Sequence, residues 1–323
     1  ATASFAGSYL GTTVLWAAVV GAFLKFIVTE GLARWQFATG STLLEGVVEH
    51  LGRTVGWAFL AYLLLWSFFV ASALISACGV TLHALIPIFD DPERGKVVFG
   101  MGASLLGLVL VLAGGYSLFE AVMKVCIVSM LLIVLVTAVV VWPGTSDVLR
   151  GLFVPSLPEQ GLDWTIALMG GIGGTVTVLC YGYWLREEGR SGPDALRTSR
   201  IDLGAAYALT GLFGIAMVII GSTVEIEGRG AGLLVTLAAR LEAALGPGGK
   251  WIFLAGALGA VFSSLLGVWQ AVPYLFADLW RMLRVRQEGP PGERDSIDTH
   301  SKAYRGYLLA LALVPMAGLF VSF

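Results

Sequence analysis

Charged residues are scarce in this chain, and their scarcity excludes most classes of soluble protein. Only 13% of the 323 residues are Asp, Glu, Lys or Arg, whereas 57% are hydrophobic. A soluble domain usually has about a quarter of its residues charged. We therefore expect much of the apolar surface to face lipid or other buried helices. The formal net charge of −2 provides no basic field, which argues against nucleic acid as a partner.

Cysteine, histidine and enzyme motifs are equally sparse. The three cysteines (Cys78, Cys126 and Cys180) lie in apolar runs without Cys-x-x-Cys spacing, and an odd number forms no disulfide framework. The sequence has no phosphate loop, no Gly-x-Ser-x-Gly, no His-Glu-x-x-His and no dinucleotide fingerprint. We therefore expect no enzymatic activity and no resident cofactor, and we see no sign of an obligate protein partner.

Long apolar runs are what the sequence has in abundance. A bilayer core of roughly 30 Å needs about 20 mostly apolar residues per helix, and the runs lack the alternation of a β-barrel. These lengths predict an all-α, multi-pass integral membrane protein of about eight spans. The spans are expected at 9–33, 55–88, 97–113, 117–142, 164–185, 202–222, 250–280 and 305–323, after a short helix tail at 1–7.

The boundaries of this arrangement are less regular than its spans. A turn is predicted at Gly114-Gly115-Tyr116, between the third and fourth spans. Because the chain opens at Ala1 and stops at Phe323 inside apolar stretches, residues 1–323 are interpreted as one transmembrane domain truncated at both ends.

The distribution of basic residues predicts the orientation. The connections at 186–200 and 281–305 are rich in arginine and are separated by two spans, so positive-inside bias makes both cytoplasmic. By alternation, 34–54 is cytoplasmic as well, and 89–96, 143–163 and 223–249 are external. Within the last connection, 231–245 has amphipathic spacing and is predicted to lie along the external membrane surface. We expect the protein in the inner (plasma) membrane.

The segment 164–190 contains the strongest local signal. Glycines at 170, 171, 173 and 174 precede the β-branched run 175–178 in the middle of a span, and both compositions weaken a helix. Discontinuous helices of this kind form the binding sites of secondary transporters, where freed carbonyls coordinate ions. A glycine-lined helix crossing is the alternative.

Four strings in this order resemble the Nramp metal-ion transporters and their divergent relatives. They are 1–40, similar to the end of that family's first helix and its second; 114–136, similar to the fifth; GGTVTVLCYGYWLRE at 173–187, similar to the broken sixth; and FSSLLGVWQAVPYLFADLWR at 262–281, similar to the eighth. The resemblance spans nearly the whole chain, from the end of helix one through helix nine. It implies a LeuT-like, inverted-repeat helical bundle.

The resemblance also implies a site, with departures. The family's sixth helix reads Ala-Thr-Val-Met-Pro-His-Asn, and its Ala carbonyl and Met sulfur bind the metal. Here Gly174 can still offer a carbonyl, while Thr177 puts a hydroxyl in place of the thioether. Oxygen ligands favour Mg²⁺ or Mn²⁺ over softer ions. Gly173 and Thr175 complete the expected substrate segment, and Cys180 is either a further metal ligand or a buried inert thiol. The family's ligands on helices one and ten would lie outside residues 1–323.

The groups that the family uses for proton coupling are missing. The third helix, 55–88, contains no acidic residue, and Trp184 stands where the family has a histidine. A proton relay needs titratable groups at depth, so we expect no coupling of that type. Two other polar residues of the spans, Glu30 and Gln270, are candidates for the transport pathway, although Glu30 could simply reach water and Gln270 could bond between helices.

Three functional hypotheses follow. The first is a secondary-type transporter of divalent metal ions, with the metal as substrate and the lipid bilayer as surroundings. The second is a symporter of the same fold for an amino acid or another small organic solute, whose carboxylate would lie at a helix N-terminus of the broken segment. The third is a membrane scaffold or receptor that transports nothing.

Overall fold

The computed structural model describes residues 2–158, 161–172, 174, 176–190, 193–223, 232–284 and 297–320. Residues 114–120, 122, 177, 193, 233, 240, 241 and 243–245 are described in their backbone only. Every element that these residues form is helical. In chain order they are α1 (Thr2–Leu10), η1 (Gly11–Val14), α2 (Leu15–Thr39), α3 (Leu43–Leu51), α4 (Arg53–Leu85), α5 (Pro92–Val140), α6 (Thr145–Phe153), α7 (Leu162–Gly171), α8 (Val176–Glu187), α9 (Pro193–Ser222), α10 (Gly232–Leu245), α11 (Pro247–Arg284), α12 (Lys302–Leu313) and η2 (Val314–Phe320).

The long helices confirm the all-α membrane prediction. Seven stretches of the described chain are long and apolar enough to cross a membrane: Thr2–Thr39, Arg53–Leu85, Pro92–Ala113, Met123–Val140, Asp194–Ser222, Pro247–Arg284 and Lys302–Phe320. The predicted span at 164–185 is divided between α7 and α8, each too short to cross alone. Many large apolar side chains of the long helices are exposed, among them Phe23, Leu65 and Val139, as expected for surfaces that face lipid.

Two details differ from the expected boundaries. The tail at 1–7 forms α1, which continues through the 3-10 turn η1 into α2 instead of being separated from it. The residues of the predicted turn at Gly114-Gly115-Tyr116 have helical backbone within α5 (Pro92–Val140), but the two predicted spans that they join are present as Pro92–Ala113 and Met123–Val140. Glycine weakens a helix, but in an apolar environment a loop would leave its peptide groups without partners, so helical hydrogen bonding persists there.

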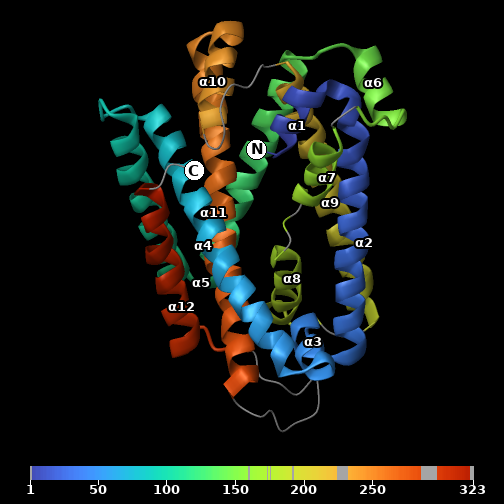
Figure 1. Ribbon diagram of the computed structural model, residues 1–323, viewed down its shortest axis with the longest axis vertical. Coiled ribbons are helices and arrows are strands. Elements are labelled where there is room, and N and C mark those ends of the chain that lie inside the picture. Colours follow the sequence, from blue (N-terminus) through green and yellow to red (C-terminus); the bar gives the residue numbers. More distant parts are fainter. Residues whose placement is uncertain are drawn as a thin grey trace.

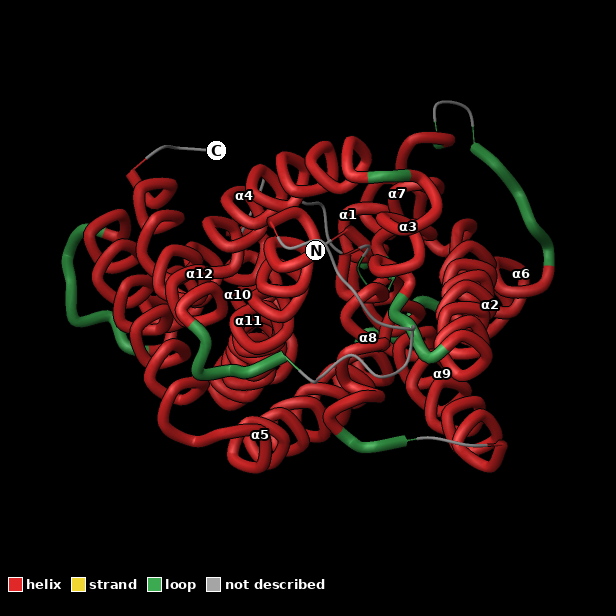
Figure 2. The backbone as a smooth tube through the Cα atoms, turned by 90° about the horizontal axis from the view of Figure 1, so that it is seen from below, coloured by secondary structure: helices red, strands yellow, loops and turns green. Residues whose placement is uncertain are grey.

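Two hydrophobic cores organise the bundle. One contains buried side chains of α4, α8, α12 and the C-terminal part of α11, with Trp269 and Leu265 fully buried. The other contains side chains of α1, α2, α7, α9 and the N-terminal part of α11, including Phe253. Figures 1 and 2 show the corresponding division, with α4, α11 and α12 on one side of the molecule and α2 and α9 on the other.

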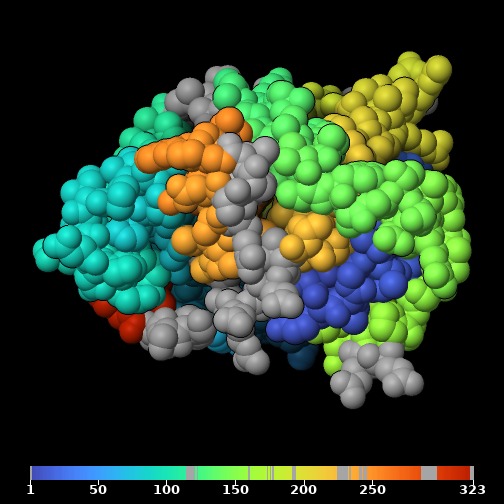
Figure 3. Space-filling model, turned by 90° about the horizontal axis from the view of Figure 1, so that it is seen from above, coloured from blue at the N-terminus to red at the C-terminus, as the bar shows by residue number. Residues whose placement is uncertain are grey.

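The two ends of the bundle divide the connections as the predicted alternation has them, and which end is cytoplasmic stays a prediction. α3 and the C-terminal ends of α8 and α11 lie together at one end, and α6 and α10 lie at the opposite end (Figure 1). Seen from that opposite end, the blue N-terminal residues and the green residues around α6 lie on the same face as orange residues around position 250 (Figure 3). The helix predicted at 231–245 forms as α10, with Leu237 and Ala238 buried in the second core. Its place on a membrane surface stays a prediction.

Candidate functional site

The interruption predicted between residues 170 and 177 is present. α7 ends at Gly171, Ile172 turns to an extended conformation (φ −72°, ψ 112°), and α8 begins at Val176. Gly174 has a φ of +25°, in the region where a side chain would be strained. In a glycine-lined helix crossing, a Cβ added at the glycine would clash with the neighbouring helix. At Gly170 such a Cβ would meet nothing within 4 Å, so the alternative of a crossing does not explain this glycine.

The break lies where the chain passes from one core to the other. Leu168 and Ile172, on the α7 side, are buried in the core of α1, α2 and α9. Val176 and Cys180, on the α8 side, are buried in the core of α4, α11 and α12. A single straight helix over these residues would have to pack its side chains against both cores. The discontinuity lets each half-helix pack separately, and it leaves backbone groups between them for other partners.

One of these groups already has a partner that the sequence did not predict. The Lys25 ammonium, on α2, donates a hydrogen bond to the Gly174 carbonyl oxygen, with an Nζ to O distance of 3.2 Å. Lys25 and Gly174 are separated by 149 residues in the chain. A positive charge therefore lies at the carbonyl that was expected to bind a metal ion.

The other residues expected at the break are placed as follows. Thr177 lies in the first turn of α8, and Gly173 and Thr175 lie outside the described residues. Cys180 is fully buried, and its thiol donates to the Val176 carbonyl oxygen at 3.6 Å. The thiol is therefore a buried group that is hydrogen-bonded within α8. A role for Cys180 in metal binding stays a prediction.

The two residues expected in the transport pathway are each engaged in contacts. Glu30 is 7% exposed and forms ion pairs with Arg34 and with Arg200 of α9, both at 2.6 Å. Gln270 is buried in α11 and accepts a hydrogen bond at 2.9 Å from the Trp184 indole, at the position where the family resemblance expected a histidine. The structure thus connects α2 with α9 and α8 with α11 at these residues.

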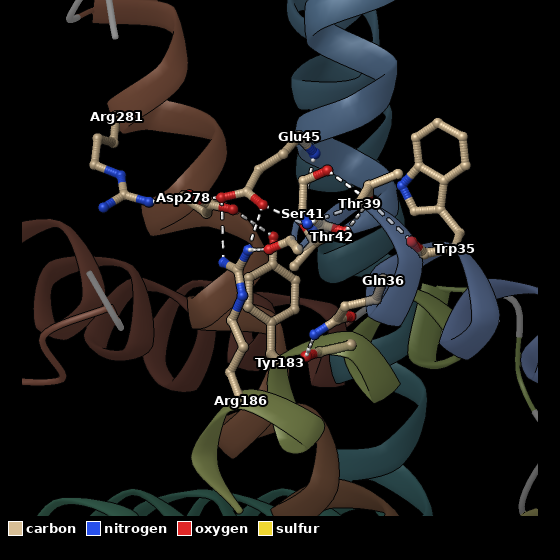
Figure 4. Close-up of polar contacts among 12 residues, drawn as sticks. Trp35, Gln36, Thr39, Ser41, Thr42, Glu45, Tyr183, Arg186, Asp278 and Arg281 are labelled. Carbon is tan, nitrogen blue, oxygen red and sulfur yellow. Dashed lines mark hydrogen bonds and ion pairs between the residues drawn. The ribbon is translucent and has the colours of Figure 1, made fainter. Parts of the chain in front are cut away.

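A second polar site, whose central residue the sequence reasoning did not single out, lies at the end of the bundle predicted to be cytoplasmic (Figure 4). Its centre is Glu45 of α3, which is fully buried. The Arg186 guanidinium, on α8, donates to both carboxylate oxygens of Glu45, one of them at 3.2 Å. Arg281 of α11 lies 3.9 Å from Glu45 and 2.8 Å from Asp278, and Tyr183 donates to Asp278 at 2.7 Å. The cluster joins three helices.

The charges of this cluster balance, which explains how they persist in a buried place. Two carboxylates, Glu45 and Asp278, face two guanidinium groups, Arg186 and Arg281. Burial alone would lower the pKa of Arg186, but its hydrogen bonds to Glu45 and the Glu45 charge raise that pKa above the ordinary value. Arg186 therefore keeps its charge, and several hydrogen bonds hold the pair against desolvation.

A local motif positions Glu45. The sequence Thr42-x-x-Glu45 forms a capping box at the start of α3: the Thr42 N–H donates to the Glu45 carboxylate at 2.7 Å, and the Glu45 N–H donates to the Thr42 hydroxyl at 3.3 Å. Nearby, the Gln36 amide of α2 donates to the Gly182 carbonyl of α8 at 2.7 Å. The Thr-x-x-Glu pattern was visible in the sequence and would have predicted the cap, though not its distant partners.

The fold and the two sites define a class: a polytopic helical membrane protein whose discontinuous helix joins two packed halves, closed by polar contacts at one end. Among known proteins, the crystal structure of a variant of the Eremococcus coleocola manganese transporter superposes with a TM-score of 0.71, at 16% identity, covering 98% of this chain and 66% of that one. A second variant of the same transporter gives the same values. This likeness confirms the LeuT-type fold.

Sequence comparison identifies the family. The whole chain, residues 1–323, matches Nramp, the natural resistance-associated macrophage protein-like family. The chain is also 23% identical over 221 residues to the divalent metal cation transporter MntH of Aeromonas hydrophila subsp. hydrophila, across 66% of this chain and 52% of that protein. The chain belongs to the Nramp family. It spans about half the length of this curated relative and two-thirds of the manganese transporter.

Proposed function

We propose that this protein is a secondary transporter of divalent metal ions in the plasma membrane, with hard ions such as Mn²⁺ and Mg²⁺ as substrates. The observation that carries the proposal is the helix break between Gly171 and Val176, with Gly174 inside it at a φ of +25°. Freed carbonyls at such a break are suitable ligands for a cation. The relatives named above are described as metal transporters, which supports the same substrate class.

The identity of the side chains around the break favours hard cations. Thr177 supplies an oxygen where the resembled motif has a thioether, and Gly173, Gly174 and Thr175 supply only oxygen ligands. Cys180 carries the only sulfur in the sequence from 170 to 180, and its thiol is turned to the backbone of its own helix. Mg²⁺ and Mn²⁺ are therefore preferred over softer ions in this proposal.

Proton coupling of the family's type is not part of the proposed mechanism. α4 carries no acidic residue along Arg53–Leu85. Trp184, at the position of the resembled histidine, has no titratable group and donates its indole N–H to Gln270. Without an acidic side chain in α4 and without a histidine at position 184, the proton relay expected from the resemblance lacks the residues that would carry the proton.

Transport by the native polypeptide in liposomes tests the proposal. Mn²⁺ or Mg²⁺ should enter a lumen filled with a metal-sensitive fluorophore, without acidification of the lumen. Thr177→Ala should reduce Mn²⁺ flux at limiting ion concentration about tenfold, the effect of losing about 1.4 kcal/mol of binding. Thr210→Ala is the matched control, because the exposed Thr210 hydroxyl bonds only to Ala206 of its own helix among the described residues. Equal flux in both variants would contradict the assigned site.

A second function is favoured by one specific observation. The Lys25 ammonium at the Gly174 carbonyl puts a positive charge at the break, and a positive charge attracts the carboxylate of an amino acid or similar solute. Calorimetric titration with Mg²⁺, Mn²⁺ and glycine on one sample distinguishes the two functions. Binding of glycine without binding of either metal would replace the metal assignment with the solute symporter.

A further inference from the structure

Lys25 is the feature of the molecule that the proposed function leaves unexplained. An ionised side chain within a membrane span is costly and usually has a functional role. Lys25 lies near the middle of α2, on the same face as the buried residues Ala18, Ala22 and Thr29. It therefore points into the bundle and not toward the lipid-facing side of α2, where Phe23 and Ile27 are exposed.

The packing of α2 holds Lys25 at the break. One turn before it, Gly21 lies so close to α7 that a Cβ would be 2.9 Å from the Met169 backbone. One turn after it, the Thr29 hydroxyl donates to the Lys25 carbonyl at 2.8 Å and bonds to the Tyr207 hydroxyl of α9 at 2.8 Å. Both neighbours tie this part of α2 to adjacent helices. The start of the lysine side chain is thus fixed, while its flexible stem can still move.

Its partner is the same atom that the proposed function assigns to the substrate. Among the described residues, the Gly174 carbonyl oxygen is the hydrogen-bond acceptor of Lys25, and Lys25 forms no ion pair. An ammonium group and a metal ion both require the lone pairs of that oxygen. They also repel each other, strongly so where the effective dielectric constant is low.

We propose that Lys25 is a tethered cation that occupies the Gly174 carbonyl when the site is empty and competes with the substrate cation for it. The inference rests on the proposed metal transport. The ammonium donates a hydrogen bond to a carbonyl that lies between α7 and α8, outside both helices. The arriving metal ion displaces the lysine side chain, so the affinity for metal is lower than the oxygen ligands alone would give.

Binding of Mn²⁺ to the purified native polypeptide, measured by calorimetry, tests the competition. Lys25→Met removes the charge and the donor, and Lys25→Gln removes the charge but keeps a donor. Both should bind Mn²⁺ at least tenfold more tightly than the wild type. Lys25→Arg keeps a cation and should bind no more tightly than the wild type. The matched control is Lys124→Met, which removes a lysine from another apolar span, Met123–Val140, and should change the affinity less than twofold.

The outcomes separate this inference from the function on which it rests. If the wild type binds Mn²⁺ and neither Lys25→Met nor Lys25→Gln binds it more tightly, the competition is overturned while metal transport stands. If wild type and both neutral variants bind glycine but no Mn²⁺, metal transport fails and the competition fails with it. Tighter binding in Lys25→Gln alone would still support the competition if Lys25→Met does not fold.

Discussion

Glu45→Ala is expected to lower the free energy of unfolding by about 3–5 kcal/mol. Glu45 is fully buried and accepts hydrogen bonds from Arg186 through both carboxylate oxygens. Without it, the Arg186 guanidinium, with only 17% of its side chain exposed, would keep its charge in a poorly solvated place. The penalty arises from this orphaned charge more than from the lost attraction. The capping box of α3 would be lost as well.

Unfolding in detergent, followed by helical circular dichroism during denaturant titration, measures the effect. Glu49→Ala is the matched control, because Glu49 is an exposed glutamate on the same helix. A surface substitution of this kind changes stability by about 0.5 kcal/mol or less. If both variants lose similar amounts of unfolding free energy, the buried cluster does not stabilise the protein more than a surface residue does.

A double variant separates the orphaned charge from the lost contact. Glu45→Ala combined with Arg186→Ala removes both charges, so it should destabilise the protein less than the sum of the two single variants. Arg281 provides a second cation 3.9 Å from Glu45, which makes full compensation unexpected. Strict additivity would mean that the two side chains do not interact in solution.

The sequence predicted features that depend on local pattern. Apolar length located the spans, and the glycines before the β-branched run at 175–178 located the break in the helix. Both signals work because the membrane imposes its constraint on each segment separately. The helical backbone at Gly114-Gly115-Tyr116, between two spans that were predicted, was not foreseen, since composition indicates a weak helix but does not show what else the backbone could bond to.

The contacts between distant residues at the candidate sites could not be predicted from local sequence patterns. Glu45 and Arg186 are 141 residues apart, and Lys25 and Gly174 are 149 residues apart. Lys25 and Glu30 are five residues apart in the sequence, a spacing that does not place them on one face of a helix. This spacing could not show that Lys25 would reach the break or that Glu30 would pair with Arg200 of α9. Pairings of this kind are decided by the packing of distant helices.

Gly221→Ala is expected to produce the second large effect, a loss of about 1–3 kcal/mol in the free energy of unfolding. A Cβ at Gly221 of α9 would lie 2.2 Å from the carbonyl oxygen of Ser4 in α1. The contact is reciprocal, since a Cβ at Gly7 of α1 would lie 2.2 Å from the carbonyl oxygen of Val218. Both obstacles are backbone atoms, so no side-chain rotation relieves them, and the two helices would have to separate.

Thermal unfolding in detergent checks this expectation, with Gly102→Ala as the control. Gly102 also lies in a membrane-length helix, α5, but a Cβ there meets nothing within 4 Å. Alanine favours a helix interior over glycine by about 0.5–1 kcal/mol, so Gly102→Ala should be neutral or slightly stabilising. Because one separation of α1 from α9 accommodates both new methyl groups, Gly7→Ala with Gly221→Ala should cost less than the sum of the single changes. If Gly221→Ala melts with the wild type, α1 and α9 do not pack this closely.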